Sequence, residues 1–279
     1  MWLAAGWLLL AVAFAATAAT HGDKADEYVA RAKSKARIGD FRGAISDFTK
    51  AIKLKPGDAE AYVGRGVAKM LTDCVYLVGG ICWGHEHTLY VAADDPIMDF
   101  TMAIRLNPGY AEAYFRRALA AFDRADVARG IKGYEEVDVA GYRADAAHEI
   151  EDFTKAIQLK PDFVVAYVGR GIARLDAGDS DGAIEDYNMA SRIDSRSAKE
   201  SGEYISPAFF KRGTARLAKG DSDGAIGDFT KAIELKPDYG EAYSARGNAK
   251  QAKGDEAGSH FDLAKAAALR ASPPPSPRK

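Results

Sequence analysis

The chain has few of the side chains that reactive sites depend on. Its 279 residues include only two cysteines and five histidines. None of the histidines stands beside a serine or cysteine in a recognisable catalytic motif, and no glycine-rich phosphate loop is present. These absences predict that the protein is not an enzyme and that it has no cofactor.

The chain also lacks an excess of charge of either sign. It has 38 lysines and arginines against 40 aspartates and glutamates, which gives a net charge of −2. No basic stripe with interleaved aromatic residues occurs, so a nucleic acid is not the expected partner. Hydrophobic residues make up 47% of the chain, which is enough to build a packed core.

The chain contains one sequence pattern that is repeated six times. Each copy opens with an aromatic ring followed three residues later by arginine, as in Tyr167 and Arg170, and closes with a pattern such as Asp228 to Leu235. The opening rings are Tyr28, Tyr62, Tyr114, Tyr167, Phe209 and Tyr243, and the closing rings are Phe48, Phe100, Phe153, Tyr187, Phe229 and Phe261. An alanine follows each closing ring by three residues, and the apolar spacing within each copy predicts two amphipathic helices joined by a short turn.

These positions resemble the tetratricopeptide repeat (TPR) family, whose units are helical hairpins of about 34 residues. The resemblance covers residues 24–270. It implies an all-α fold, an α-solenoid with a right-handed superhelix of about six units, in which the first helices line a concave groove that holds a peptide or protein. The expected repeats are residues 24–57, 58–109, 110–161, 162–195, 204–237 and 238–270.

Two neighbouring repeats are longer than the others. The opening and closing rings of the second repeat, Tyr62 and Phe100, are almost twice as far apart in the chain as Tyr28 and Phe48 of the first, and the third repeat is equally long. The extra residues fall at 71–93 and 123–148, which places both insertions at the turn inside the hairpin. A smaller insertion lies between repeats 4 and 5, near Ser195 to Ser206. Insertions in repeat proteins map to loops on one face, often the binding face.

The insertion of the second repeat holds both cysteines. In an exported protein, Cys74 and Cys82 are expected to form a disulfide. A second interpretation is a metal site, because Cys74, Cys82, His85 and His87 supply four ligands of types that zinc or copper accepts. The spacing matches no familiar structural zinc pattern, and free thiols are a third possibility.

Arginine and aspartate recur at fixed positions that flank the core. The arginines are Arg31, Arg65, Arg117, Arg170, Arg212 and Arg246, and the aspartates are Asp47, Asp99, Asp152, Asp186 and Asp228. We interpret them as partly buried ion pairs between helices rather than as a ligand-binding array. The last repeat has His260 where aspartate is expected, so we predict that each aspartate pairs with the arginine of the following repeat.

The resemblance also indicates which side chains face the groove, one and five residues after each opening ring. In repeats 2 to 5 these are Val63, Val67, Phe115, Leu119, Val168, Ile172, Phe210 and Thr214. The stripe is mostly apolar, so the expected ligand is an amphipathic helix or an extended apolar segment of another protein. An alternative is that the chain's own insertions or tail cover the stripe, since exposed apolar stripes are costly.

The two ends of the chain differ in character from the repeats. Residues 1–19 carry no charge and end in small residues, which predicts an export signal cleaved near Ala18 or Ala19; an uncleaved membrane anchor is the alternative. Residues 271–279 are rich in proline and are expected to be disordered. The sequence therefore predicts a non-catalytic binding or assembly module outside the cytoplasm, periplasmic or secreted, and the alternative is a metal-binding or redox-responsive protein that uses the Cys/His insertion.

Overall fold

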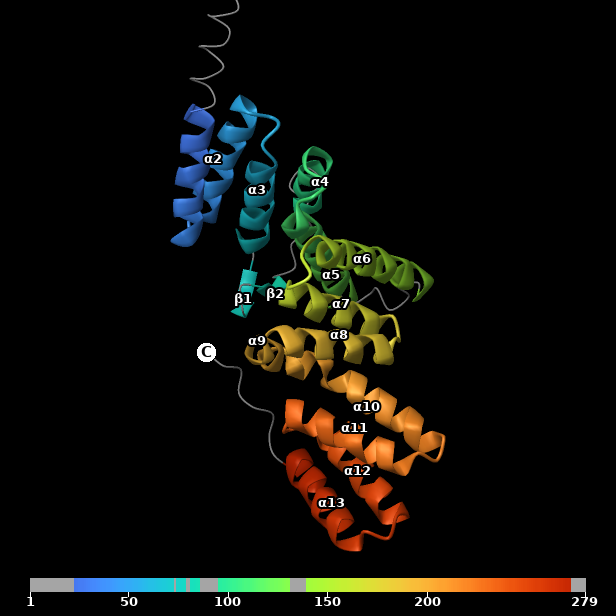
Figure 1. Ribbon diagram of the computed structural model, residues 1–279. Helices are drawn as coiled ribbons and strands as arrows, with labels where there is room; N and C mark the ends of the chain where they lie inside the picture. The colour runs from blue at the N-terminus through green and yellow to red at the C-terminus, as the bar shows by residue number, and fades with distance from the viewer. Residues whose placement is uncertain (1–22, 73, 79–80, 86–94, 131–138, 272–279) are drawn as a thin grey trace, which may run out of the picture. The chain divides into compact units, whose positions relative to one another are not determined.

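The computed structural model describes residues 23–72, 74–78, 81–85, 95–130 and 139–271 (Figure 1). The chain separates into two compact units, Met1–Lys160 and Pro161–Lys279. Each unit is a stack of helical hairpins in which consecutive helices pack against one another. The predicted all-α fold of repeated two-helix units is confirmed, and one β-hairpin is added to it.

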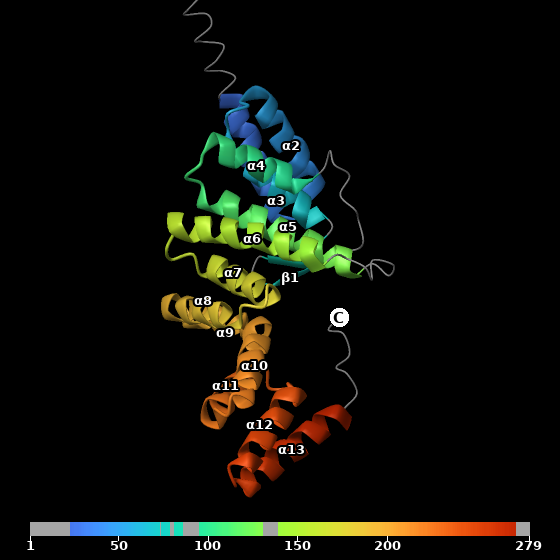
Figure 2. The ribbon, with the colours of Figure 1, turned by 90° about the vertical axis from the view of Figure 1, so that its right-hand side faces the viewer.

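Unit 1 holds three hairpins. Its first helix covers residues 23–37. The remaining elements are α2 (Phe41–Leu54), α3 (Ala59–Thr72), β1 (Cys74–Val78), β2 (Ile81–His85), α4 (Pro96–Leu106), α5 (Ala111–Gly130) and α6 (Val139–Leu159). Figure 2 shows α5 and α6 running side by side over most of their length.

Unit 2 holds the other three hairpins and one short extra helix. Its elements are α7 (Val164–Asp176), α8 (Ser180–Ile193), α9 (Ser195–Glu200), α10 (Gly202–Ala218), α11 (Ser222–Leu235), α12 (Gly240–Ala252) and α13 (Glu256–Ala271). The extra helix α9 and the first turn of α10 account for the small insertion predicted between repeats 4 and 5.

Four hairpins close through the same short turn. In repeat 4, Gly178 adopts φ +90°, a conformation that favours glycine, and the carboxylate of Asp179 then accepts a hydrogen bond from the backbone N–H of Gly182. Repeats 1, 5 and 6 repeat this arrangement with Asp40, Asp221 and Asp255. The turn thus ends one helix and starts the next within a few residues.

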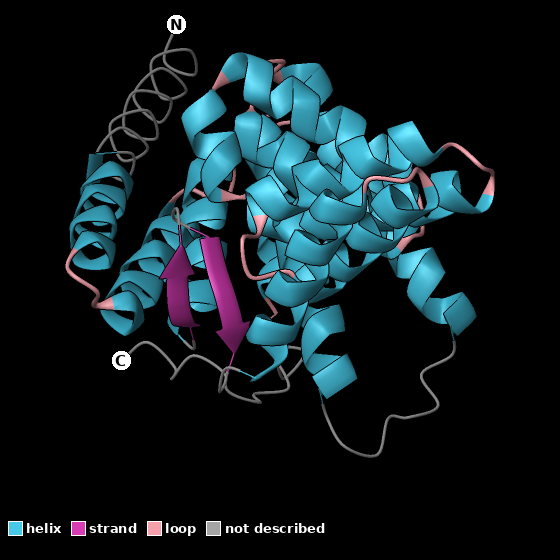
Figure 3. Ribbon diagram, turned by 90° about the horizontal axis from the view of Figure 1, so that it is seen from below, coloured by secondary structure: helices cyan, strands magenta, loops and turns pink. Residues whose placement is uncertain are grey.

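The second and third hairpins contain the large insertions, at the turn, as predicted. In repeat 2 the antiparallel strands β1 and β2 follow α3, and Asp95 and Pro96 then begin α4 (Figure 3). In repeat 3 the insertion lengthens the helices, because α5 and α6 have 20 and 21 residues where α11 has 14.

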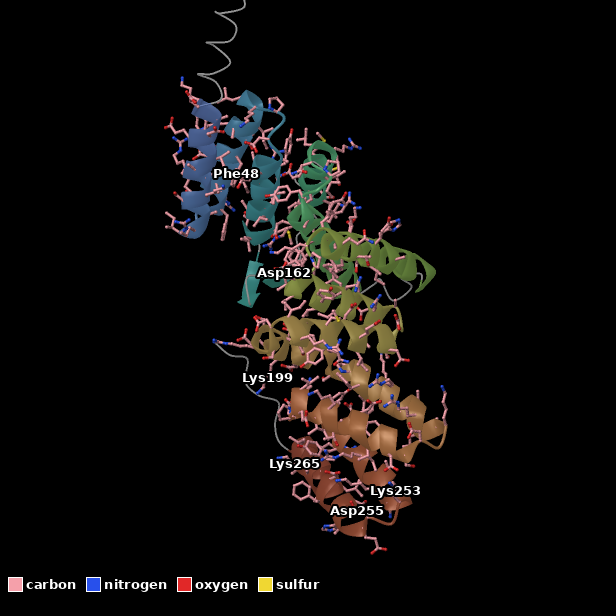
Figure 4. The ribbon with its side chains drawn as sticks, in the orientation of Figure 1. Phe48, Asp162, Lys199, Lys253, Asp255 and Lys265 are labelled. Carbon is pink, nitrogen blue, oxygen red and sulfur yellow. The ribbon has the colours of Figure 1, made fainter. Side chains whose placement is uncertain are left out.

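The core of each hairpin is formed by the closing ring and the small residues around it. Phe48, labelled in Figure 4, lies where α2 faces α3 and belongs to a cluster with Ala51 and Ala61. Phe100, Phe153 and Phe229 are fully buried. A Cβ at Gly66 would lie 2.7 Å from the ring of Phe100, so glycine is needed there for the helices to approach.

The assignment of Phe261 as the closing ring of repeat 6 is wrong. Phe261 is 67% exposed, whereas Asp262 and Ala266 are buried. Leu263 takes the ring position, because it follows Tyr243 at the same distance as Phe229 follows Phe209, and it packs against Gly247. The aromatic residue at 261 was two positions out of register.

Among the described residues, no helix is both long and apolar enough to cross a bilayer. The predicted export signal and the proline-rich tail from residue 272 onward lie outside the described residues.

Candidate functional site

The side chains predicted to line a groove all lie on first helices of the hairpins. Five of them, Val63, Phe115, Leu119, Val168 and Ile172, are buried. Val67 and Phe210 are half-buried, and Thr214 is exposed. An open apolar stripe is therefore not what these residues form, and that part of the prediction is wrong. Their part in binding a partner is not tested by the structure.

The physical reason is visible where Phe210 meets the next repeat. The ring of Tyr239, four residues before the opening ring of repeat 6, lies 5.2 Å from the ring of Phe210. Ile205, four residues before the opening ring of repeat 5, packs in the same way beside Gly171 of α7. An apolar residue at this position thus covers the first helix of the preceding hairpin.

Sequence reasoning missed this covering residue, although its signal was present. The position four residues before the opening ring holds Tyr110, Phe163, Ile205 and Tyr239 in repeats 3 to 6. Burial raises the pKa of both the Tyr110 and the Tyr239 hydroxyl, with smaller contributions from nearby glutamates. Each of these apolar residues precedes a helix whose own apolar face is already packed in the core. The residue itself is therefore expected to pack against a neighbouring hairpin.

Part of the first-helix surface that stays accessible in unit 2 is polar. Thr214 and Asn248, each five residues after an opening ring, are exposed. The Thr214 hydroxyl donates to the carbonyl oxygen of Phe210 at 2.9 Å, and the guanidinium of Arg270 donates to the Ser244 hydroxyl at 3.1 Å. This surface, which we call the inner polar surface, offers hydroxyl and amide groups over an aromatic base.

The recurrent arginine and aspartate form six ion pairs, each within one hairpin. Arg212 donates through Nη2 to Asp228 at 2.7 Å, so the prediction that Asp228 would bind Arg246 is wrong. Arg246 binds Asp262 instead, at 2.7 Å, and Asp262 is the sixth aspartate that His260 had concealed. The other four pairs are Arg31 with Asp47, Arg65 with Asp99, Arg117 with Asp152 and Arg170 with Asp186.

A second cation joins five of these six pairs. It lies four residues after the arginine, on the same helix, and its contacts with the aspartate are 2.9 to 3.0 Å: Lys35, Lys69, Arg174, Arg216 and Lys250. Repeat 3 has Ala121 there. Hydrogen bonds from Arg31 and Lys35 lower the pKa of Asp47 despite its burial. Burial alone would raise the pKa of Asp262, but the bonds from Arg246 and Lys250 outweigh it and lower this pKa.

The arginines also connect neighbouring hairpins. Nη1 of Arg65 donates to the hydroxyl of Thr49 in the preceding repeat at 3.3 Å. Arg117 with Thr101 and Arg246 with Thr230 repeat the contact at 3.4 and 3.1 Å. Because each arginine binds an aspartate on the other helix of its hairpin, the interpretation as interhelical ion pairs is confirmed.

The cysteine-bearing insertion forms the β-hairpin. Its register pairs Cys74 with His85 and Cys82 with Leu77, so the two cysteines are not opposite each other. Cys82 lies three positions before His85, the partner of Cys74, which is about 10 Å along the strand, and disulfides need Cα atoms within about 7 Å. The predicted disulfide would therefore require a different pairing, and it stays a prediction.

The alternative metal site is likewise not tested. His87 lies outside the described residues. No group of three or more histidine, cysteine, aspartate or glutamate side chains suited to a metal occurs in the described part of the chain.

Two parts of the chain match family models of this repeat. Residues 29–69 match the model described as "Tetratricopeptide repeat", and residues 213–254 match the one described as "TPR repeat". The chain therefore contains tetratricopeptide repeats, which generally serve as protein-interaction scaffolds and are not themselves catalytic.

Curated relatives share the repeat region only. Tetratricopeptide repeat protein 6 of Homo sapiens is 29% identical over 157 residues, which are 56% of this chain and 24% of that protein. The mitochondrial import receptor subunit TOM70 of Rattus norvegicus is 28% identical over 176 residues, 55% of this chain and 26% of that protein. The match thus spans about a quarter of each relative.

Solved structures show the same fold. The MamA protein superposes with a TM-score of 0.51 and 23% identity, covering 79% of this chain and 96% of that one. YrrB, described as a TPR protein with an unusual peptide-binding site, superposes with a TM-score of 0.52 and 16% identity, covering 78% and 90%. At these identities the likeness concerns the fold alone.

Proposed function

We propose that the protein is a non-catalytic scaffold that binds another protein or a peptide through the faces of its first helices. The observation that carries this proposal is the inner polar surface of unit 2, where Thr214 and Asn248 remain exposed on the first helices α10 and α12. YrrB, a protein of similar fold, is described as having a peptide-binding site. An extended segment is the ligand best suited to hydroxyl and amide groups in a row, since its backbone groups need partners.

The predicted groove residues enter this proposal in two roles. Phe210 and Thr214 of unit 2 are accessible in part or fully and are proposed as contacts, whereas half-buried Val67 belongs to unit 1 and is not. The five buried residues are proposed to hold the helices of their own unit at a fixed spacing. A partner is thus proposed to touch polar groups and ring edges, and to leave the buried apolar residues undisturbed.

The proposal is tested by capturing partners from the cell that produces the protein. Thr214→Glu combined with Asn248→Glu places two carboxylates on the inner polar surface without changing a buried residue. Asn188→Glu combined with Gly227→Glu, on exposed faces of the second helices α8 and α11, adds the same charge elsewhere. We expect a partner held by the wild type and the control to be lost from the first variant. Equal capture by all three proteins would reject this surface.

We further propose that the chain is exported, on the strength of residues 1–19. Their uncharged, apolar run and the small residues at Ala18 and Ala19 are typical of a segment that signal peptidase removes. The intact mass of the protein isolated from its own cell tests this. A mass that includes Met1 to Ala19 in a protein recovered from the cytoplasm would reject export.

A further inference from the structure

The β-hairpin of the second repeat has no counterpart in the uninterrupted repeats. Strands β1 and β2 form an antiparallel sheet of two strands, and no third strand joins them among the described residues. A two-stranded hairpin is only marginally stable in water, and three or more strands are usually needed for a stable sheet. The hairpin would therefore be stabilised by a further strand.

The outer edge of β1 is where such a strand can be added. Strand β2 also contacts α5, whereas β1 makes its main contacts with β2 (Figure 1). Natural sheets protect their edges with lysine, proline or a bulge. Strand β1 has the sequence CVYLV and contains neither a charged residue nor a proline. An uncharged edge of this kind is a template for pairing with another extended strand.

The register of the hairpin determines which backbone groups of β1 lie at the open edge. Val78 pairs with Ile81 across two intervening residues. In a hairpin of this kind, the pair that closes the turn and every second pair beyond it exchange the ladder hydrogen bonds. Val75 and Leu77 lie between these positions. Their N–H and C=O groups are therefore directed away from β2, to the outer edge of β1.

This edge is complementary to itself. If a second copy of β1 pairs antiparallel with the first, with Tyr76 opposite Tyr76, then Val75 of each copy lies opposite Leu77 of the other. All of these valines and leucines direct their backbone groups to the shared edge, so each open N–H and C=O gains a partner. Aromatic residues at directly opposite positions also stabilise a sheet. Charge does not oppose the pairing, because β1 carries none.

We infer that two copies of the chain associate through β1 and form a four-stranded sheet in the order β2, β1, β1, β2. Both copies use the same surface, related by a two-fold axis at Tyr76, so the association closes at a dimer. A different protein would have to supply a strand of matching register, whereas a second copy has one by symmetry. This interface lies in unit 1 and is independent of the partner surface proposed for unit 2.

A proline on the outer edge tests the backbone pairing. Leu77→Pro removes an outward N–H and leaves the ladder with β2 in place, because proline is tolerated on an edge strand where its missing N–H would face away from the sheet. Leu77→Thr is the control, since it changes the same side chain but keeps the N–H.

Sedimentation equilibrium over a wide range of protein concentration measures the association. We expect the wild type and Leu77→Thr to approach twice the monomer mass, and Leu77→Pro to dimerise at least about tenfold more weakly. Circular dichroism should show the same helical content in all three proteins. A monomeric wild type would overturn the inference, and so would equal dimerisation of the wild type and a folded Leu77→Pro variant.

Disulfide cross-linking tests the register. In a chain with Cys74→Ser and Cys82→Ser, the substitution Tyr76→Cys places two thiols at directly opposite positions on the two-fold axis, within disulfide distance. Trp83→Cys is the control, because Trp83 pairs with Tyr76 on β2 and lies three strand spacings, about 14 Å, from its counterpart. With a mild oxidant we expect Tyr76→Cys to form a linked dimer and Trp83→Cys to stay mostly unlinked. Equal linkage of the two variants, or none with Tyr76→Cys, would overturn the symmetric pairing.

Discussion

The uninterrupted and the interrupted hairpins of this protein reach the same packing by different routes. In repeats 1, 4, 5 and 6, arginine and aspartate are 16 residues apart and a short glycine–aspartate turn connects their helices. In repeats 2 and 3 they are 34 and 35 residues apart. The shortest contact of each pair is nevertheless 2.6 or 2.7 Å in all six repeats.

The comparison shows that the contacts between helices, more than the turn, determine how a hairpin packs. A turn only brings its two helices together, and longer loops cost little more entropy to close, about 0.6 kcal/mol for each doubling of length. The ion pair and the closing ring then select one register. The insertions are consequently tolerated by the fold and are available for another role.

The largest expected effect comes from removing the aspartate at the centre of a pair. Asp186→Asn leaves Arg170 and Arg174 facing a neutral group in a buried site, and we expect the free energy of unfolding to fall by about 3–5 kcal/mol. Asp152→Asn is the matched variant in an interrupted hairpin, where one arginine binds a more exposed aspartate. It should cost about half as much or less. Urea denaturation followed by circular dichroism measures both, and equal losses would contradict the role given to the second cation.

Acid should weaken the pairs in a defined pH range. The pKa values of Asp47 and Asp262 are lowered in the folded chain, so their contribution is complete above the ordinary aspartate pKa of 3.8 and is lost as the pH falls below it. We expect the melting temperature of the wild type to fall steeply below about pH 4. Asp47→Asn should start lower and fall less steeply, whereas exposed Glu185→Gln should follow the wild type. Parallel curves for Asp47→Asn and the wild type would contradict this.

The short turn of the uninterrupted hairpins predicts a smaller effect. Gly220→Ala forces a Cβ onto a residue with φ +84°, and we expect a loss of about 1–2 kcal/mol. Gly227→Ala, in the exposed interior of α11 with nothing near its Cβ, is the control and should raise stability by up to about 1 kcal/mol. Opposite signs for two glycine-to-alanine changes seven residues apart would locate the effect in the turn. A loss at both positions would reject that location.

The smallest effect is expected from removing an insertion. Replacing residues 73–97 by residues 220–226 gives Arg65 and Asp99 the same spacing as Arg212 and Asp228. We expect the helices of repeat 2 to remain and the free energy of unfolding to change by less than about 1 kcal/mol, because the ion pair and the ring of Phe100 are kept. Thermal unfolding measures the change in stability, and circular dichroism measures the helical content. A large loss would mean that the β-hairpin holds α3 and α4 together.

Much of the fold could be predicted because the sequence pattern of one helical hairpin recurs six times. The helix pairs follow from the apolar spacing, the turns from their glycine–aspartate pairs, and the place of both insertions from the spacing of the rings. The partner of each aspartate was predicted wrongly because the pattern required an aspartate directly before an aromatic ring, and Asp262 precedes Leu263. Arginine and aspartate have a constant spacing in the uninterrupted copies, which is the same for Arg31 and Asp47 as for Arg246 and Asp262. This spacing predicts the correct pairing.

The candidate site was harder to predict than the fold. Burial of Phe115 or Val168 depends on which side chains of other segments pack against it. The position of a residue within its own helix does not predict those contacts. The apolar residues before the opening rings, such as Tyr239, are the sequence signal for this burial, because they cover the first helix of the preceding hairpin.

Binding of a partner to the first-helix face of unit 2 can be followed by hydrogen–deuterium exchange of the complex with a captured partner, because α10 and α12 carry the inner polar surface and α11 does not. We predict slower exchange in α10 and α12 around Thr214 and Asn248, with α8 and α11 unchanged on their exposed faces. Protection confined to the exposed faces of α8 and α11, with α10 and α12 unchanged, would show that the partner binds the second helices instead.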